Sequence, residues 1–248
     1  MSNLEEKINA IEEVSDLESL QFFQTQPHPC SYLDNEVAST VFLSPKQSIN
    51  RALYSQLSDY GFRRSGTHIY KPLCESCQAC VPMRIPVALF KPSRSQKRTR
   101  KRNNDLNIIH IDNIDNDEHY ALYERYINER HKDGDMYPPS RSQFQNFLSS
   151  PWHCASYYEF RVGDRLIATA VVDTMDNGIS AVYTYYDPSE DKRSLGSFVI
   201  LFLVEEAKKR QLKSVYLGYW IKNSSKMNYK SAYRPLEIQS GDRWVLVN

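Results

Sequence analysis

The sequence predicts an α+β protein with two domains, the second built on a mixed, mostly antiparallel sheet. Its 248 residues, of which 41% are hydrophobic, suffice for two cores of ordinary size. Short strands joined by turn residues fill the second half of the chain, and one long apolar helix follows them. We place the boundary near Asp105, which gives an N-terminal domain (residues 1–105) and a C-terminal domain (residues 106–248).

In the N-terminal domain the clearest element is a helix over residues 49–60. Ile49, Leu53 and Leu57 fall on one face of this helix, and Gly61 ends it. Extended segments are expected at residues 30–43, 67–70 and 83–90.

The C-terminal domain begins with helices. Tyr120, Tyr123 and Ile127 recur at a spacing of three and four residues, which predicts a helix over residues 116–132. A shorter helix is expected over residues 143–148.

An antiparallel meander follows these helices. Its strands are expected at residues 155–162, 166–173 and 179–186, because the turn sequences Gly163-Asp164 and Asp176-Asn177-Gly178 separate them. The remaining elements are expected to be a long apolar helix (195–210), a strand (214–221), a short helix (224–232) and two strands (236–239 and 244–247).

This order of elements matches the arrangement of the GCN5-like acyltransferases (GNAT). In that arrangement the helix that follows the central strand directs its N-terminus at the acyl donor. Gly196 opens the long helix directly after a strand, and a glycine there lets free backbone N–H groups approach an anionic group. We therefore expect Gly196 and Ser197 to lie at the donor.

Three cysteines stand two residues apart, at Cys74, Cys77 and Cys80. Such a run presents thiolates to zinc or to an iron–sulfur cluster, and a fourth ligand is still needed. Cys30 is the best candidate for that ligand. The alternative is that these are reduced thiols packed as small hydrophobic side chains, and both interpretations stay open.

A basic run lies just before the predicted boundary. The net charge is only +1, so contact with a polyanion must rest on local asymmetry. Between Lys91 and Arg102 there are seven basic residues and no acidic one. We expect the following residues to contact phosphates, the alternative being a solvated linker: Lys97, Arg98, Arg100, Lys101 and Arg102.

No membrane association is expected. Residues 1–20 lack the basic start and apolar stretch of a secretory signal, and no apolar run approaches the roughly 20 residues of a membrane span. The sequence therefore predicts a cytoplasmic protein.

Several segments in order resemble the arginyl-tRNA–protein transferase family, in its short bacterial leucine-transferring form, over roughly residues 20–240. They are Cys30-Ser-Tyr-Leu33, Gly61–Gly66, Tyr70-Lys-Pro-Leu-Cys74, Ser95-Gln-Lys-Arg98, Tyr185-Tyr-Asp187-Pro188, Ser194-Leu-Gly196, Tyr216-Leu-Gly-Tyr-Trp220 and Lys226-Met-Asn-Tyr229-Lys230. The resemblance implies transfer of leucine from leucyl-tRNA to the α-amine of proteins that begin with Asp or Glu, which marks them for N-end rule degradation. It also implies an acyltransferase-like C-terminal domain. In eukaryotic relatives, differently arranged cysteines are associated with an iron–sulfur cluster.

The chemistry of such a transfer asks little of acid–base groups, because an aminoacyl ester is already activated and alignment supplies much of the rate. No cofactor is expected to be required for the transfer itself. Asp187 is expected to hold the α-ammonium of the donor, and Tyr185 or Tyr219 to relay a proton. The full catalytic set that we expect is Tyr183, Tyr185, Asp187, Ser197 and Tyr219.

Selection of an acidic first residue requires cationic partners, and the arginine fork suits a carboxylate. The expected partners are Arg63, Arg64 and Arg84, followed by Lys226 and Arg234.

Three alternatives stand beside this interpretation. An arginyl donor is possible in place of leucyl. An N-acetyltransferase that uses acetyl-CoA would need a loop richer in glycine than residues 193–198. A zinc-ribbon RNA-binding module would explain the cysteines and the basic run but not the second domain.

Overall fold

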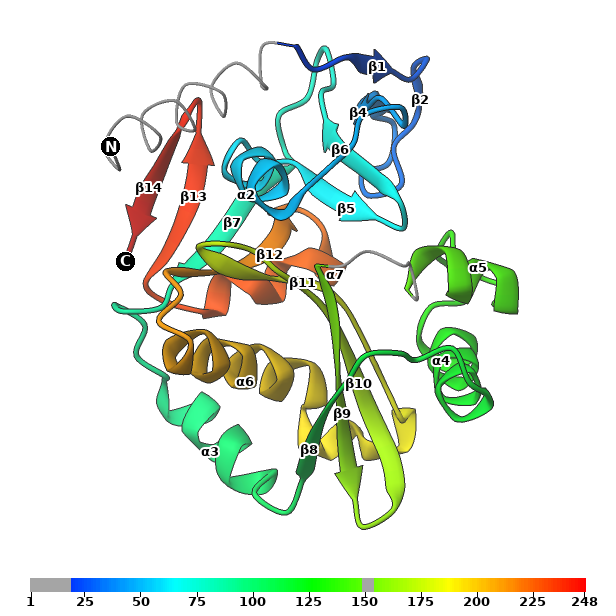
Figure 1. Cartoon of the computed structure of the whole chain (residues 1–248), viewed down its shortest axis with the longest axis vertical. Coiled ribbons are helices and arrows are strands. Elements are labelled where there is room, and N and C mark those ends of the chain that lie inside the picture. The colour runs from blue at the N-terminus through cyan, green and yellow to red at the C-terminus, as the bar shows by residue number, and fades with distance from the viewer. Residues whose placement is uncertain (1–18, 149–153) are drawn as a thin grey trace, which may run out of the picture.

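The computed structural model describes residues 19–148 and 154–248. Within these ranges the strands form an eight-stranded sheet, a four-stranded sheet and a two-stranded ribbon. Figure 1 shows the four-stranded sheet at one end of the molecule, with the larger sheet and its helices beneath it. The architecture is mixed α/β with mostly antiparallel sheets, in agreement with the prediction.

The eight-stranded sheet has the strand order β14-β13-β7-β12-β11-β10-β9-β8. Its strands are β7 (Val81–Pro86), β8 (Asn107–Ile111), β9 (Ala155–Val162), β10 (Arg165–Thr174), β11 (Gly178–Tyr186), β12 (Ser214–Trp220), β13 (Leu236–Ser240) and β14 (Arg243–Val247). The described neighbours pair antiparallel, except that β11 and β12 are parallel. This parallel pair interrupts the meander at the middle of the sheet.

Helices cover both faces of this sheet (Figure 1). On one face α6 (Leu195–Lys209) packs with α3 (Arg94–Arg102), and on the other lie α4 (Asp117–Arg130) and α5 (Arg141–Phe147). Successive strand residues point to opposite faces. Tyr158 on β9 therefore joins the core beneath α6, whereas Tyr157 joins the core beneath α4. Three short segments complete this part: η1 (Pro188–Arg193), α7 (Ser225–Asn228) and η2 (Tyr229–Ala232).

The N-terminal module, which we define as residues 19–80, contains the two small sheets and one helix. Its elements are β1 (Phe22–Gln24), β2 (His28–Pro29), β3 (Val37–Ala38), β4 (Thr40–Leu43), α2 (Arg51–Asp59), β5 (Arg63–Ser65) and β6 (His68–Pro72). Asn50 caps α2, because its side chain accepts a hydrogen bond from the backbone N–H of Leu53 at 2.8 Å. Leu53 and Leu57 of α2 then pack with Tyr216 of β12, so the module shares a core with the larger sheet.

The predicted boundary near Asp105 is wrong for residues 81–102. β7 lies between β13 and β12 in the larger sheet, and α3 packs against α6. Both elements therefore belong to the C-terminal part. Local periodicity carries no information on this pairing, because β7 and β12 are far apart in the sequence.

Most other predicted elements are confirmed. The helices expected over residues 49–60, 116–132 and 195–210 are α2, α4 and α6. In the described part of the chain, no helix combines the length and apolar content needed to cross a bilayer.

Candidate active site

The parallel strands β11 and β12 pair over a short stretch and then separate. Pairing joins Gly178–Ser180 to Ser214–Tyr216, although both strands continue beyond it. Each strand carries a bulge just past the paired stretch, with Val182 the additional residue on β11 and Leu217 on β12. Because a bulge bends its strand and increases the local twist, the two bulges turn the strands apart. We call the separated part (residues 181–186 and 217–220) the β11–β12 fork.

The N-terminus of α6 lies beside β11. Ser194 precedes the helix in the left-handed region (φ 55°), and its side chain makes no capping hydrogen bond. The first backbone N–H groups of α6 thus lack a side-chain acceptor at the N-cap. A Cβ built at Gly196 would meet only the Tyr186 ring, at an ordinary 3.8 Å. The protein's own atoms therefore leave room for a ligand at the positive end of the helix dipole.

Tyrosines from two elements, β11 and α4, gather at the fork. The ring of Tyr126 on α4 lies 4.8 Å from that of Tyr186 and 6.4 Å from that of Tyr183. The hydroxyl of Tyr183 is buried and has no hydrogen-bond partner among the described residues, and burial raises its pKa. A buried unpaired hydroxyl is costly, which favours a ligand group as its partner.

The segment α7–η2 links the two branches of the fork. Trp220 on β12 donates a hydrogen bond to the Asn228 side chain at 3.4 Å, and Lys230 donates to the carbonyl of Tyr219 at 2.7 Å. On the other branch, the nearby Tyr186 contributes to a rise in the pKa of Tyr229, of which burial is the main cause.

Two of the predicted catalytic residues lie at the fork. Tyr183 is on β11, and Ser197 is in the first turn of α6. Their catalytic roles stay predictions.

The structure contradicts the proton-relay roles predicted for Tyr185 and Tyr219. Tyr185 is completely buried on the α4 side of the sheet, and its hydroxyl lies 3.1 Å from Nδ1 of the buried His119. Tyr219 donates its hydroxyl proton to the carbonyl of Gly61 at 2.8 Å, and burial raises its pKa well above the usual range. Both hydroxyls therefore fix the positions of their own side chains inside the protein, since neither can contact a substrate.

Asp187 also has another role. Its carboxylate caps η1 by accepting hydrogen bonds from the backbone N–H and the hydroxyl of Ser189, at 3.0 and 2.7 Å. Arg125 and Arg165 lie 3.4 and 3.9 Å from its second oxygen. These contacts outweigh the burial and lower its pKa. Because like charges repel, these two guanidinium groups disfavour binding of the donor's α-ammonium group at Asp187, which the sequence predicted.

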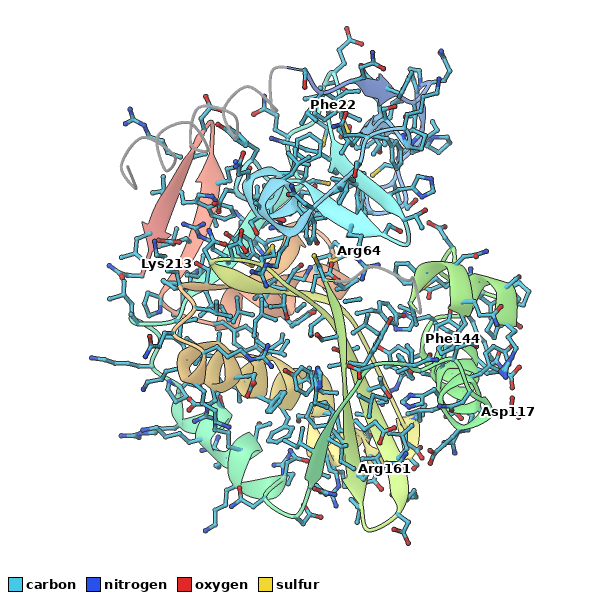
Figure 2. The ribbon with its side chains drawn as sticks, viewed as in Figure 1. Phe22, Arg64, Asp117, Phe144, Arg161 and Lys213 are labelled. Carbon is cyan, nitrogen blue, oxygen red and sulfur yellow. The ribbon has the colours of Figure 1, made fainter. Side chains whose placement is uncertain are left out.

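Two of the arginines expected to select the acceptor are paired inside the protein. Arg64, which Figure 2 labels between the four-stranded sheet and the larger sheet, is completely buried. It makes a bidentate ion pair with the equally buried Asp173, at 2.8 and 2.7 Å. Arg84 pairs with Glu237 at 2.5 Å and with Asp59 at 2.9 Å. Because carboxylates of the protein already neutralise both guanidinium groups, the structure disfavours their predicted contact with a substrate carboxylate.

The other predicted acceptor contacts differ from one another. The exposed Arg234 donates to the backbone carbonyls of Ser231 and Asn248, away from the fork, which contradicts its assignment. The side chain of Lys226 lies outside the described part of the structure. Arg63 differs from these residues. Its Nε and Nη2 are buried and have no hydrogen-bond partner among the described residues.

The basic run forms α3, a helix rather than a linker. A capping box starts it, in which Ser93 accepts from the N–H of Gln96 and the Gln96 side chain accepts from the N–H of Ser93. The Gln96 amide also donates to the carbonyl of Ala232 in η2 at 3.2 Å. At the other end Asn103 donates to the carbonyl of Arg193, just before α6, at 2.9 Å. The two ends of α3 are thus attached to η2 and η1, the segments that follow the two branches of the fork.

The five basic residues predicted to bind tRNA divide into two groups. Arg100 pairs with Glu205 of α6 at 2.5 Å, and Arg102 donates to the carbonyl of Lys192. Lys97, Arg98 and Lys101 are exposed and have no acidic partner in the described ranges. The first group attaches the helix to the protein, and the second presents its charge to solvent.

The four cysteines of the predicted metal site line one pocket of about 480 Å³. Burial, together with the nearness of Cys74, Cys30 and Cys77, raises the pKa of Cys80 to about 12. No three possible ligands in the described ranges are arranged as a metal site, however. The thiols are close together, but as placed they do not fit a bound ion. Cys154 is separate and buried, as expected of a structural residue.

Sequence reasoning did not single out three residues at the fork, namely Tyr126, Tyr229 and Lys230. Tyr229 and Lys230 lie in a segment that resembled the family, yet no periodicity distinguished them. Tyr126 looked like one more apolar residue of a helix.

Comparison with known proteins bears on the whole chain. Residues 28–98 match the family described as "Arginine-tRNA-protein transferase, N terminus", and residues 118–240 match "Arginine-tRNA-protein transferase, C terminus". The chain is 52% identical over 233 residues to the aspartate/glutamate leucyltransferase of Saccharophagus degradans, covering 94% of this chain and 99% of that protein. Its identity to the protein of the same name from Pseudomonas fluorescens SBW25 is 53% over 235 residues, covering 95% and 100%.

Among solved structures, FemX is similar over 86% of this chain and 83% of its own, with 9% identity and a TM-score of 0.46, which is too low to support an argument. The identity to full-length relatives and the match to both parts of the family decide the assignment. This chain belongs to the arginine-tRNA-protein transferase family and is an aminoacyltransferase.

Proposed function

We propose that the protein transfers leucine from leucyl-tRNA to the α-amine of proteins that begin with Asp or Glu, in the cytoplasm, and so marks them for degradation. The β11–β12 fork is the observation that carries this proposal. It combines the uncapped N-terminus of α6 with the unpaired hydroxyl of Tyr183. The relatives named leucyltransferases favour leucine as the donor amino acid, and arginine is the alternative.

The fold of the C-terminal part supports the same reading. We propose that it is a GCN5-like acyltransferase sheet, in which a parallel pair of strands separates and the next helix directs its N-terminus into the gap. β11, β12 and α6 have this order and arrangement. The acyl group of the donor would lie between the strands.

The reaction replaces the ester bond of the aminoacyl-tRNA with an amide bond. The amine of the acceptor attacks the ester carbonyl, the C–O bond to the ribose breaks, and the proton lost by the amine ends on the ribose oxygen. Negative charge develops on the carbonyl oxygen during the attack. In this proposal the backbone N–H groups at Gly196 and Ser197 stabilise that charge, and the Tyr183 hydroxyl donates a hydrogen bond to an oxygen of the donor.

The basic face of α3 is suited to the tRNA backbone. Lys97, Arg98 and Lys101 present their charges to solvent there. The two ends of the helix are attached to η2 and η1, which follow the branches of the fork. A tRNA held there by its phosphates would have its acceptor end near α6.

Replacing Lys97, Arg98 and Lys101 together with alanine is expected to weaken tRNA binding without unfolding the protein. Each neutralised phosphate releases counterions, so the slope of log affinity against log salt should fall by roughly 2. Filter binding of leucyl-tRNA at several salt concentrations measures this slope. Lys46, Lys208 and Lys213, which are exposed elsewhere, provide a control triple of equal charge. Equal loss in both triples would contradict a specific surface on α3.

We propose that the transfer uses no cofactor and that the cysteine cluster binds zinc or an iron–sulfur cluster after a small rearrangement of its loop. The position of all four cysteines in the lining of one pocket supports this, because cysteine sulfurs are the ligands of zinc and iron–sulfur sites. Protein purified without oxygen should contain metal, and Cys80→Ser should lose it, as metal analysis and an absorption spectrum would detect. Colourless, metal-free and fully active protein would overturn the metal site.

Label transfer tests the proposed function directly. Purified protein is incubated with radiolabelled leucyl-tRNA or arginyl-tRNA and with peptides beginning with Asp, Glu or Ala. Label from leucyl-tRNA on the acidic peptides alone is the expected result. Label from arginyl-tRNA would change the donor, and transfer to no peptide would refute the proposal.

A further inference from the structure

Two cationic side chains lie buried where the N-terminal module meets the end of β12. Arg63 is 5% exposed and Lys230 is 7% exposed. Neither forms an ion pair with a carboxylate of the described residues, in contrast to Arg64 and Arg84. Burial of an unpaired charge is costly, so such an arrangement calls for an anion that the chain itself does not supply.

The hydrogen bonds of the two side chains leave donors open. Lys230 donates to the Tyr219 carbonyl at 2.7 Å and meets the weakly accepting sulfur of Met227 at 3.2 Å, so one of its three N–H groups is free. Arg63 uses only Nη1, which donates to the carbonyls of Phe62 and Ser58 at 2.7 and 3.3 Å. Its Nε and Nη2 have no acceptor.

Both cations contact the same residue of β12. The guanidinium of Arg63 lies over the ring of Tyr219, 5.9 Å from its centre, while Lys230 holds the Tyr219 carbonyl. Burial, together with the nearby Arg63, lowers the pKa of Lys230 to about 7. The two side chains therefore form one site, with Tyr219 between them.

The 480 Å³ pocket has Tyr70, Cys80 and Ile221 in its lining, but neither Arg63 nor Lys230. The ring of Tyr70 lies 6.1 Å from the ring of Tyr219, over which Arg63 lies. Ile221 directly follows β12, one branch of the fork. Contact between Arg63 and a group in this pocket therefore requires Tyr70 to move.

We propose that Arg63 and Lys230 together bind the side-chain carboxylate of the acceptor's first residue. The inference rests on the proposed function and specifies how the acidic acceptor is recognised. A carboxylate satisfies both cations, whereas the amide of Asn or Gln leaves them unpaired. Because a site built for a polar group strongly rejects an analogue that lacks it, the wild-type protein should prefer Asp to Asn by at least about 100-fold in kcat/KM.

The test compares leucine transfer to matched peptides that begin with Asp or Asn, at saturating leucyl-tRNA, for wild type, Lys230→Met and Arg63→Met. Each variant is expected to lose about 100-fold in kcat/KM for the Asp peptide, mainly through KM, and to change little with the Asn peptide. Lys230→Arg should recover part of the Asp preference. Since neither cation pairs with a carboxylate, neither substitution leaves a buried carboxylate without its partner, and both variants should stay folded, as circular dichroism would show.

The outcomes separate the inference from the function on which it rests. A wild-type protein that prefers Asp, with variants that keep the same preference, overturns the inference alone. A wild-type protein that transfers to neither peptide overturns the proposed function. If a variant does not fold, a crystal structure of the wild-type protein with the Asp peptide decides the matter: the carboxylate is expected within about 3 Å of Lys230 or Arg63, and any other position overturns the inference.

Discussion

Replacement of Arg64 with alanine is expected to unfold the protein or bring it close to unfolding. The substitution leaves Asp173 buried without its partner, and removal of one member of a buried ion pair costs about 3–5 kcal/mol. Tyr54 also donates to Asp173 at 2.8 Å, but a single neutral hydrogen bond does not replace a guanidinium. Since the total stability of a domain is about 5–15 kcal/mol, this loss is large. Denaturant unfolding followed by circular dichroism measures it.

A matched control exists in the same region. Arg51 of α2 pairs with Asp176 at 2.6 Å near the same end of β10, but both side chains are largely exposed. Arg51→Ala should therefore cost at most about 1 kcal/mol. Replacing Arg64 and Asp173 together with apolar residues should restore much of the stability. If Arg64→Ala kept its stability and instead lost the preference for acidic acceptors, the residue would be a substrate contact after all.

Replacement of Gly196 with leucine is expected to abolish most of the transfer activity while the fold survives. The backbone at this position does not need glycine, because a Cβ would make only an ordinary contact with Tyr186. A side chain here would occupy the space beside the N–H groups at the start of α6. Displacement of the donor by about 1 Å can cost on the order of 100-fold in rate. The kcat/KM for leucine transfer and the melting temperature together test this.

A smaller substitution at Gly196 and a control substitution at another glycine test whether the size of the side chain causes the loss of activity. Gly196→Ala should give a smaller loss of activity, with a melting temperature unchanged or slightly higher, because glycine weakens a helix by roughly 0.5–1 kcal/mol relative to alanine. Gly134, which also lacks a positive φ and lies in the loop after α4, is a control position for alanine. Wild-type activity in Gly196→Leu would place the donor elsewhere.

Local sequence patterns predicted the helices with an apolar face and the strands between tight turns. They did not predict α3, in which only Gln96 is buried, so no apolar periodicity existed to detect. The capping box from Ser93 to Gln96 was the available signal. They also placed β7 in the wrong domain, because strand pairing between distant segments leaves no local trace.

Sequence reasoning pointed to the candidate site only through residues whose backbone position it could predict. Gly196 and Ser197 follow from a helix start after a strand, which the sequence displays. The neighbours Arg63 and Arg64 look alike in the sequence, yet one pairs with a buried carboxylate and the other does not. Only tertiary packing, which brings Asp173 to Arg64, separates their roles.

The central claim is that the aminoacyl group binds in the β11–β12 fork, at the N-terminus of α6. A crystal structure with a nonhydrolysable leucyl-adenosine analogue tests it most directly. We expect the acyl oxygen within about 3 Å of the backbone nitrogens at Gly196 or Ser197, near the Tyr183 hydroxyl. An analogue bound in the cysteine-lined pocket, with the fork empty, would contradict the account.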